Sequence, residues 1–153
     1  MNKYAIVVSY EPDVIALKKL CNSIIKQGFY VILVDNSENV VLEKSFNIEN
    51  CIIIANGENL GIAYAQNIGI KYAISKGAKI ITFFDQDSVI TDGILSKLSY
   101  PVEKNKLCIT CPVSIDKLSG MEYPSHVIGR YGWPSDIYSK GMTTLIPVDI
   151  AIS

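Results

Sequence analysis

The sequence predicts an α/β protein with three layers, in which a doubly wound and mainly parallel sheet is covered by helices on both faces. Two observations support this fold class. Short apolar runs rich in Ile and Val recur without alternating apolar and polar residues, which is typical of strands buried on both faces. Segments with helical periodicity separate the runs, so strand and helix alternate. The predicted strands cover residues 4–10, 30–35, 51–55, 79–85 and 107–113.

The segment between the first two strands, residues 13–28, predicts an amphipathic helix. Asp13 is a typical N-cap residue, because its carboxylate can accept hydrogen bonds from the first free backbone N–H groups. Gly28 is a typical stop, because glycine readily adopts the left-handed conformation that ends helices. The apolar residues recur every three or four positions and form one stripe that faces the core. This stripe contains Val14, Leu17, Leu20, Cys21, Ile24 and Ile25.

Residues 61–77, between the third and fourth strands, predict a second helix with an apolar stripe. Within it, Ala65, Gly69 and Ala73 follow one another at steps of four and therefore share one helix face. Because these side chains are small, we expect this face to lie close against the sheet. The backbone of the helix should then approach the neighbouring strands more closely than larger side chains would allow.

The chain changes in character after residue 112. Residues 114–141 are rich in Gly, Pro, Ser and Tyr and show no clear period, so they predict a long loop or a hairpin. Residues 142–153 predict a further strand. We expect residues 1–153 to form a single domain, since a chain of this length buries roughly 70% of its unfolded surface.

Charge and hydropathy narrow the possible partners and compartments. Fourteen basic and fifteen acidic residues leave a formal charge of −1, which gives no electrostatic reason to expect nucleic acid as a partner. No stretch approaches the roughly 20 apolar residues that a transmembrane helix needs, and the first apolar run is too short for a signal peptide. We therefore expect a cytoplasmic protein without a transmembrane segment.

The four cysteines lie in apolar stretches, and we expect them to be reduced thiols packed in the core. Cys108 and Cys111 have the spacing of a metal-binding or redox pair. However, no second pair and no nearby histidine completes a zinc site. The other two cysteines are Cys21 and Cys51.

Polar segments follow each of the first four predicted strands. In open α/β sheets, ligands bind outside the carboxyl ends of the strands, so these segments should meet at one ligand-binding edge. They do not form a dinucleotide site or a P-loop, because the first lacks G-x-G-x-x-G and none ends in Gly-Lys-Ser/Thr. A receiver domain would need two acids after the first strand, and only Glu11 is available. The segments read SYEPD, DNSEN, NGENLG and DQDS.

Three aspartates at this edge each have two readings. Asp85 and Asp87 could belong to a solvated turn, or they could bind a hard divalent cation that also contacts phosphate oxygens. Two neighbouring carboxylates repel each other unless a cation, hydrogen bonds or solvent offset the repulsion. Asp35 could accept hydrogen bonds from a ribose hydroxyl or a base N–H, or it could cap a turn.

The four segments VVSYEPD, VILVDNS, ENLGIAYAQNIGIKYAISKGA and ITFFDQDS occur in this order within residues 3–100. Together they resemble the N-terminal half of inverting family 2 glycosyltransferases, above all the bacterial members similar to rhamnosyltransferases. The resemblance implies a nucleotide-diphospho-sugar transferase fold of the GT-A type. It also implies that residues 1–153 are a nucleotide-sugar (donor) binding domain that is truncated at the C-terminus.

The resemblance assigns roles to ten residues of this chain. Asp85 and Asp87 match the family's D-x-D motif, in which the last aspartate binds Mn²⁺ or Mg²⁺ that bridges the diphosphate. The other donor-binding residues are Ser9, Tyr10 and Glu11 for the nucleoside, Asp35 for the base or ribose, and Asn59, Gly61, Gln66 and Asn67, with Asp85, along the donor.

The activity implied by the resemblance is inverting transfer of a sugar, rhamnose in the closest members, to a polysaccharide or lipid-linked glycan acceptor at the inner face of the membrane. Family members continue for another 100 or so residues, which carry the acceptor platform and the catalytic base. Asp149 comes too early to be that base, so we expect no catalytic residue before Ser153. This chain alone should bind donor without transferring sugar, and a truncated edge would favour self-association.

Two other functions remain open on the sequence. A sugar-phosphate nucleotidyltransferase would share the scaffold, but it would need a basic, glycine-rich loop after the first strand, where this chain has SYEPD. A non-catalytic nucleotide-binding or assembly module would need no metal. Metal-linked nucleotide binding therefore distinguishes the glycosyltransferase from the module.

Overall fold

A computed structural model describes residues 2–38, 42, 46–104, 109–113, 118–122, 125–128 and 134–138 of this chain. The chain forms two compact units, residues 1–104 and residues 105–153. The first unit holds an α/β sheet and its helices, and the second holds a small hairpin. Each unit is described by itself.

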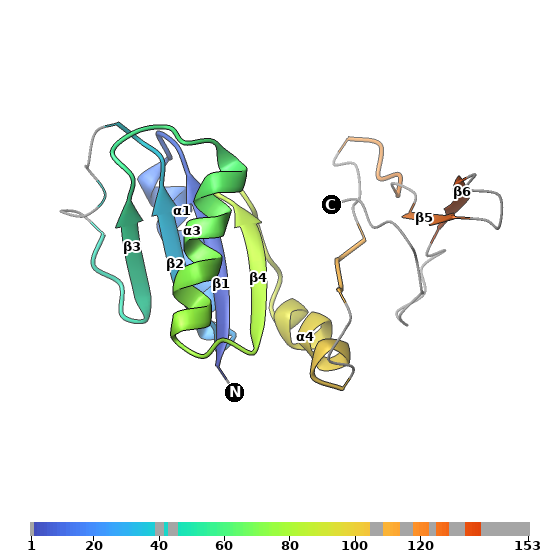
Figure 1. The fold of residues 1–153 in the computed structure, drawn as a ribbon. Coiled ribbons are helices and arrows are strands. Elements are labelled where there is room, and N and C mark those ends of the chain that lie inside the picture. Colours follow the sequence, from blue (N-terminus) through green and yellow to red (C-terminus); the bar gives the residue numbers. More distant parts are fainter. Residues whose placement is uncertain are drawn as a thin grey trace. The chain divides into compact units, whose positions relative to one another are not determined.

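The sheet of the first unit has four parallel strands in the order β3-β2-β1-β4, as Figure 1 shows. The chain adds β2 and β3 on one side of β1 and then crosses to place β4 on the other side. The order therefore reverses between β1 and β4, where doubly wound sheets bind ligands. The first four predicted strands are confirmed to within a residue, with bounds of Lys3–Ser9 for β1, Tyr30–Asp35 for β2, Cys51–Ala55 for β3 and Ile80–Asp85 for β4.

Helix α1 (Val14–Lys26) begins and ends where the sequence predicts. The Asp13 carboxylate accepts hydrogen bonds from the backbone N–H groups of Ile15 (2.8 Å) and Ala16 (3.2 Å). Gly28 follows the C-cap with φ of 84°, a conformation that costs glycine little. Four residues of the predicted stripe are buried: Leu17, Leu20, Cys21 and Ile24.

Helix α3 (Ile62–Ser75) lies close against the sheet, as its small residues predict. Ala65, Gly69 and Ala73 are its buried residues. A Cβ atom at position 69 would lie only 2.7 Å from Cγ2 and 3.1 Å from Cγ1 of Ile6 on β1. Because Gly69 has no Cβ atom, α3 can lie this close to β1.

The predicted three-layer arrangement is confirmed, with α3 over one face of the sheet and α1 over the other (Figure 1). Alternate residues of each strand point to opposite faces, so Ala5 and Val7 pack in the core beneath α1. Tyr4 and Ile6 pack in the core beneath α3. Helix α4 (Ile94–Lys104), which the sequence did not predict, adds Leu95 to the core on the α1 side.

The second unit contains an antiparallel pair, β5 (Ser125–Ile128) and β6 (Pro134–Ile137), in agreement with the hairpin reading. The strand predicted over residues 107–113 is wrong for the part that the structure describes, residues 109–113, which form no strand. Ile109 is 97% exposed and Val113 is 48% exposed. An apolar run becomes a strand only where another strand pairs with it, and none of the described strands does so here. The predicted strand at 142–153, with Asp149, lies outside the described residues.

Three of the cysteines, Cys21, Cys51 and Cys111, are free thiols, and Cys108 lies outside the described residues. Cys21 is fully buried on α1, and Cys51 at the start of β3 packs against the same core. A hydrogen bond to Cys51, together with burial, raises the pKa of the Cys21 thiol, while the same bond lowers the pKa of Cys51. Among the described helices, none is both long and apolar enough to cross a membrane.

The contact between Gly69 and Ile6 gives a stability prediction. Gly69→Ala should lower the free energy of unfolding by about 1–2 kcal/mol, because overpacking outweighs the gain in helix propensity. Urea denaturation followed by circular dichroism measures this loss. In the Ile6→Ala background the same change should be far less costly, and equal costs in both backgrounds would show that Ile6 is not the obstacle.

Candidate functional site

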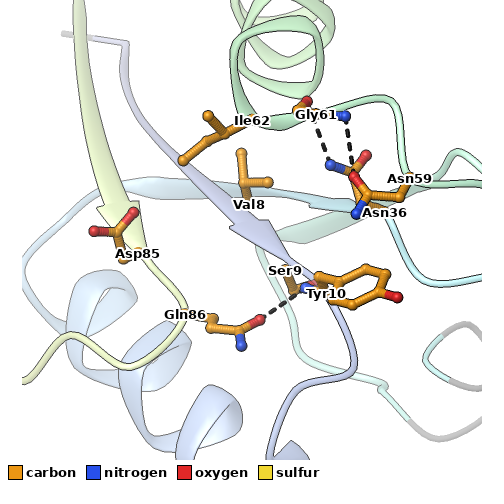
Figure 2. Close-up of a pocket in the computed structure, with 9 residues that line it drawn as sticks. All are labelled: Val8, Ser9, Tyr10, Asn36, Asn59, Gly61, Ile62, Asp85 and Gln86. Atoms are coloured by element: carbon orange, nitrogen blue, oxygen red, sulfur yellow. Dashed lines mark hydrogen bonds between the residues drawn. The ribbon is translucent and has the colours of Figure 1, made fainter.

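A pocket of about 440 Å³ opens at the carboxyl end of the sheet, between the ends of β1 and β4 and the loop that leads into α3 (Figure 2). It lies at the reversal of strand order, where the fold class predicts a ligand. Its wall combines an aromatic ring, amides, a carboxylate and two aliphatic side chains. The lining residues are Val8, Ser9, Tyr10, Asn36, Asn59, Gly61, Ile62, Asp85 and Gln86.

Five of the ten residues predicted for the site line this pocket, and five do not. The first group is Ser9, Tyr10, Asn59, Gly61 and Asp85. The second group is Glu11, Asp35, Gln66, Asn67 and Asp87.

Strand parity explains why two strand-end aspartates lie differently. Asp35 is two residues beyond Leu33 and shares its side of the sheet, toward α1. Asp85 is the register partner of Val8, which packs on the α3 side together with the pocket. The two carboxylates therefore leave the sheet on opposite faces. Asp85 is exposed and lines the pocket, whereas Asp35 is only 1% exposed.

Asp35 is the centre of a buried hydrogen-bond network beneath the β1 turn. One carboxylate oxygen, Oδ1, accepts bonds from the hydroxyls of Ser9 (2.9 Å) and Ser37 (2.7 Å) and from the Ser37 backbone N–H (3.2 Å). Both serines are themselves buried. A buried carboxylate is stable only when such donors replace water, so this network fixes the ends of β1 and β2 relative to each other.

The turn after β1 carries Tyr10 and Glu11 and is held by side chains from two other segments. The Tyr10 backbone N–H donates to Oε1 of Gln86 (2.8 Å), at the end of β4, as Figure 2 shows. The Glu11 N–H donates to the Ser37 hydroxyl (2.9 Å), which is itself bound to Asp35. Glu11 has φ of 43°, a conformation that costs energy for a residue with a side chain. These two bonds hold the turn in that conformation and leave the Tyr10 ring at the pocket wall.

Two asparagines shape the opposite wall around Gly61. The Asn59 side-chain oxygen accepts a bond from the Gly61 N–H (3.0 Å), and the Asn36 amide donates to the Gly61 carbonyl (3.4 Å). Asn36 also accepts a bond from the Asn56 side chain (2.7 Å). Gly61 has φ of 79° and is the N-cap of α3, without any side-chain cap. The loop thus presents the first turn of α3, with Ile62, to the pocket.

The remaining predicted residues lie on α3 or just after β4. Gln66 is half-buried and Asn67 is exposed, on the second turn of α3. Asp87 is exposed, in a turn closed by the bond from the Ser88 N–H to the Asp85 carbonyl (3.1 Å).

In the parts of the chain that the structure describes, no group of three or more His, Cys, Asp or Glu could hold a metal ion. A cation at Asp85 and Asp87 would therefore need further oxygens from phosphate or water, which suits Mg²⁺ or Mn²⁺.

Four lining residues were not predicted from the sequence. Asn36 and Gln86 directly follow the last residues of β2 and β4, so the rule that ligands bind at strand ends could have included them. Val8 and Ile62 are apolar, and the sequence gave no signal that separates them from core residues. Both lie on the α3 side of the sheet, where the pocket opens.

The Asp35 network predicts a loss of stability on mutation. Asp35→Ala should lower the free energy of unfolding by about 2–3 kcal/mol, because it leaves the buried Ser9 and Ser37 hydroxyls without their acceptor. Urea titration measures the change. Asp85→Ala, at the exposed end of β4, is the matched control and should change stability by less than about 0.5 kcal/mol. Equal losses in the two variants would contradict the assignment of Asp35 as a structural centre.

Comparisons with known proteins agree with the fold. The chain is 40% identical over 144 residues to the dTDP-rhamnosyl transferase RfbF of Shigella flexneri; the match covers 93% of this chain and 49% of that protein. The chain thus spans about half the length of this relative. The crystal structure of S. aureus TarS shares the fold with a TM-score of 0.59 and 23% identity, over 84% of this chain and 24% of that chain.

The predicted α/β fold of the GT-A type is therefore confirmed. The family model for glycosyl transferase family 2 matches residues 5–150, which is nearly the whole chain and includes every residue predicted for the site. The resemblance seen in the four strand-end segments is thus confirmed by an independent comparison. This chain belongs to glycosyl transferase family 2.

Proposed function

We propose that this chain binds the nucleotide-diphosphate sugar donor of a glycosyltransferase, and that residues 1–153 serve as its donor-binding domain. The observation that carries the proposal is the pocket at the strand-order reversal, which brings an aromatic ring, amides and a strand-end carboxylate together in a family 2 chain. A nucleoside diphosphate offers the matching groups: a flat base, hydroxyls and an anionic diphosphate. The name of the relative, a dTDP-rhamnosyl transferase, supports dTDP-rhamnose as the donor.

The nucleoside end of the proposed site is formed by the β1 turn. The Tyr10 ring is 42% exposed at the pocket wall, and an exposed aromatic face stacks well on a base. Ser9 lines the pocket beside it, and its hydroxyl donates to Oδ1 of Asp35. Asp35 and Glu11 thus serve donor binding by fixing the turn: Asp35 holds Ser9 and Ser37, and Glu11 takes the strained backbone conformation.

The diphosphate end of the proposed site lies between Asp85 and the start of α3. A helix N-terminus carries partial positive charge. Helix α3 begins at the pocket wall, and its N-cap residue, Gly61, has no side chain that could cap the free N–H groups. Asn59 and Gly61 border this end, and Gln66 and Asn67 lie one turn further along α3, where they would border the sugar. Asp85 and Asp87 would hold Mn²⁺ or Mg²⁺.

The chemistry follows from the charge that develops on the donor. When the bond to the sugar breaks, negative charge grows on the leaving diphosphate, and a cation held by Asp85 and Asp87 would stabilise that charge as a Lewis acid. The two carboxylates gain as well, because the cation offsets their mutual repulsion. Family membership supports an acceptor that is a polysaccharide or lipid-linked glycan, with the reaction on the cytoplasmic side of the membrane.

The metal assignment predicts a binding defect. Asp87→Ala should weaken Mn²⁺-dependent binding of dTDP about tenfold or more, because a charged ligand contact is lost, and removal of the metal with EDTA should weaken binding to the parent chain similarly. Isothermal titration calorimetry measures both. The fold should survive, since Asp87 is exposed.

The matched control is Asp92→Ala, which removes an exposed carboxylate from the same connection between β4 and α4 without touching the pocket. It should bind dTDP like the parent chain. Equal affinity of the Asp87 variant and the parent in the presence of Mn²⁺ would refute the metal site. Nucleotide binding that ignores metal altogether would favour a non-catalytic binding module.

A further inference from the structure

We propose that Gln86 is a positioning residue that couples the two ends of the donor site. A cation bound at Asp85 and Asp87 would stabilise the nucleoside-binding turn at Tyr10 through the side chain of Gln86. This inference rests on the proposed function, because it takes the two aspartates as the cation ligands. It adds a direct thermodynamic link between the cation and the nucleoside, two groups that need not touch.

The link begins with the position of Gln86 in the chain. It stands between Asp85 and Asp87, so any restraint on those two residues also restrains its backbone. Its side chain reaches across to the neighbouring strand end, where Oε1 accepts the Tyr10 N–H at 2.8 Å (Figure 2). The paired region of β1 and β4 ends at Val8 and Asp85. The bond therefore joins the two turns just beyond the last paired residues.

The β1 turn needs such a restraint because its conformation is unfavourable. Glu11 holds a φ of 43°, which costs energy in a residue other than glycine. The N–H groups of Tyr10 and Glu11 both donate to side chains, Gln86 and Ser37 respectively. The turn thus depends on two acceptors that come from other segments of the chain.

The two acceptors differ in how firmly they are held. Ser37 is buried, and Asp35 binds both its hydroxyl and its backbone N–H. Gln86 is only half-buried and has two exposed neighbours, Asp85 and Asp87. Glutamine also loses much rotamer freedom when it is fixed. Ser37 is therefore the permanent restraint, and Gln86 is the one whose strength a ligand can change.

A cation provides that change. By binding the carboxylates on both sides of Gln86, it would order the turn and lower the entropic cost of holding Oε1 against the Tyr10 N–H. Tyr10 would then be fixed for the nucleoside more of the time. Since coupling is reciprocal, the nucleoside would in turn strengthen binding of the cation.

Thymidine, which has no phosphate, tests the coupling without the cation–phosphate contact. Mn²⁺ should raise the affinity of the parent chain for thymidine about threefold to tenfold, the range that one neutral hydrogen bond provides. In Gln86→Met, which has similar length but no acceptor for the N–H, Mn²⁺ should leave thymidine affinity unchanged. Calorimetric titrations of thymidine and dTDP, each with and without Mn²⁺, provide the four affinities for every variant.

The matched control is Gln27→Met. Gln27 makes the same kind of bond, since its Oε1 accepts the Leu95 N–H at 3.1 Å, but it lies outside the pocket. This variant should keep the full effect of Mn²⁺ on thymidine. A second measurement needs no variant: Mn²⁺ should slow hydrogen exchange in the peptide that contains Tyr10 and Glu11, as followed by mass spectrometry.

The outcomes separate this inference from the proposed function. If Mn²⁺ strengthens dTDP but not thymidine, or if the effect on thymidine survives in Gln86→Met, the coupling role of Gln86 is overturned and the metal site stands. If Gln86→Met lowers thymidine affinity, relative to the parent chain, by the same factor with and without Mn²⁺, then Gln86 is an ordinary contact. That result also overturns the coupling role. If Mn²⁺ strengthens neither ligand in the parent chain, the metal site itself fails.

Discussion

The pocket depends above all on one buried carboxylate. Asp35 accepts three hydrogen bonds on a single oxygen, from Ser9 at the end of β1 and Ser37 just after β2. Burying a carboxylate without such bonds would cost several kcal/mol, so the folded state strongly favours this arrangement of the local chain. The ends of β1 and β2 are thereby fixed, and the Tyr10–Glu11 turn, which binds to Ser37, is fixed with them. The shape of the pocket wall that carries Tyr10 follows from this centre.

The other wall depends on packing rather than on charge. Gly69 lets α3 lie against Ile6, and the position of the helix then determines where Gly61 and Ile62 border the pocket. Asn59 and Asn36 complete this wall: the Asn59 side chain accepts from the Gly61 N–H, and the Asn36 amide donates to the Gly61 carbonyl. The contacts that fix the two walls thus lie on opposite faces of the sheet, and the walls meet at its carboxyl edge, as expected at the reversal point of a doubly wound sheet.

Most of the fold could be predicted from the sequence, because it is set by local patterns. The apolar runs, the Asp13 cap and the small residues of α3 each act over a few positions, and each was confirmed. The run at 109–113 was misread because strand formation needs a partner that the run itself does not specify.

The rule for strand ends found Ser9, Tyr10 and Asp85, which line the pocket. It did not reveal that Asp35 faces the opposite side, although the two-residue period of strands contains that information. The bond from Tyr10 to Gln86 joins residues 76 positions apart, and no local pattern predicts it.

Gly69 also has a consequence for how this domain tolerates change over evolution. It lies eight residues along α3 from Gly61, roughly 12 Å at the usual rise per residue, and it touches no part of the pocket. Yet a larger residue there would push the whole helix outward, and the pocket wall would move with it, because helices shift as rigid bodies. The position of the helix, and of the pocket wall at its start, therefore depends on the absence of a side chain at position 69. This interior position therefore affects the shape of the pocket although it does not line it.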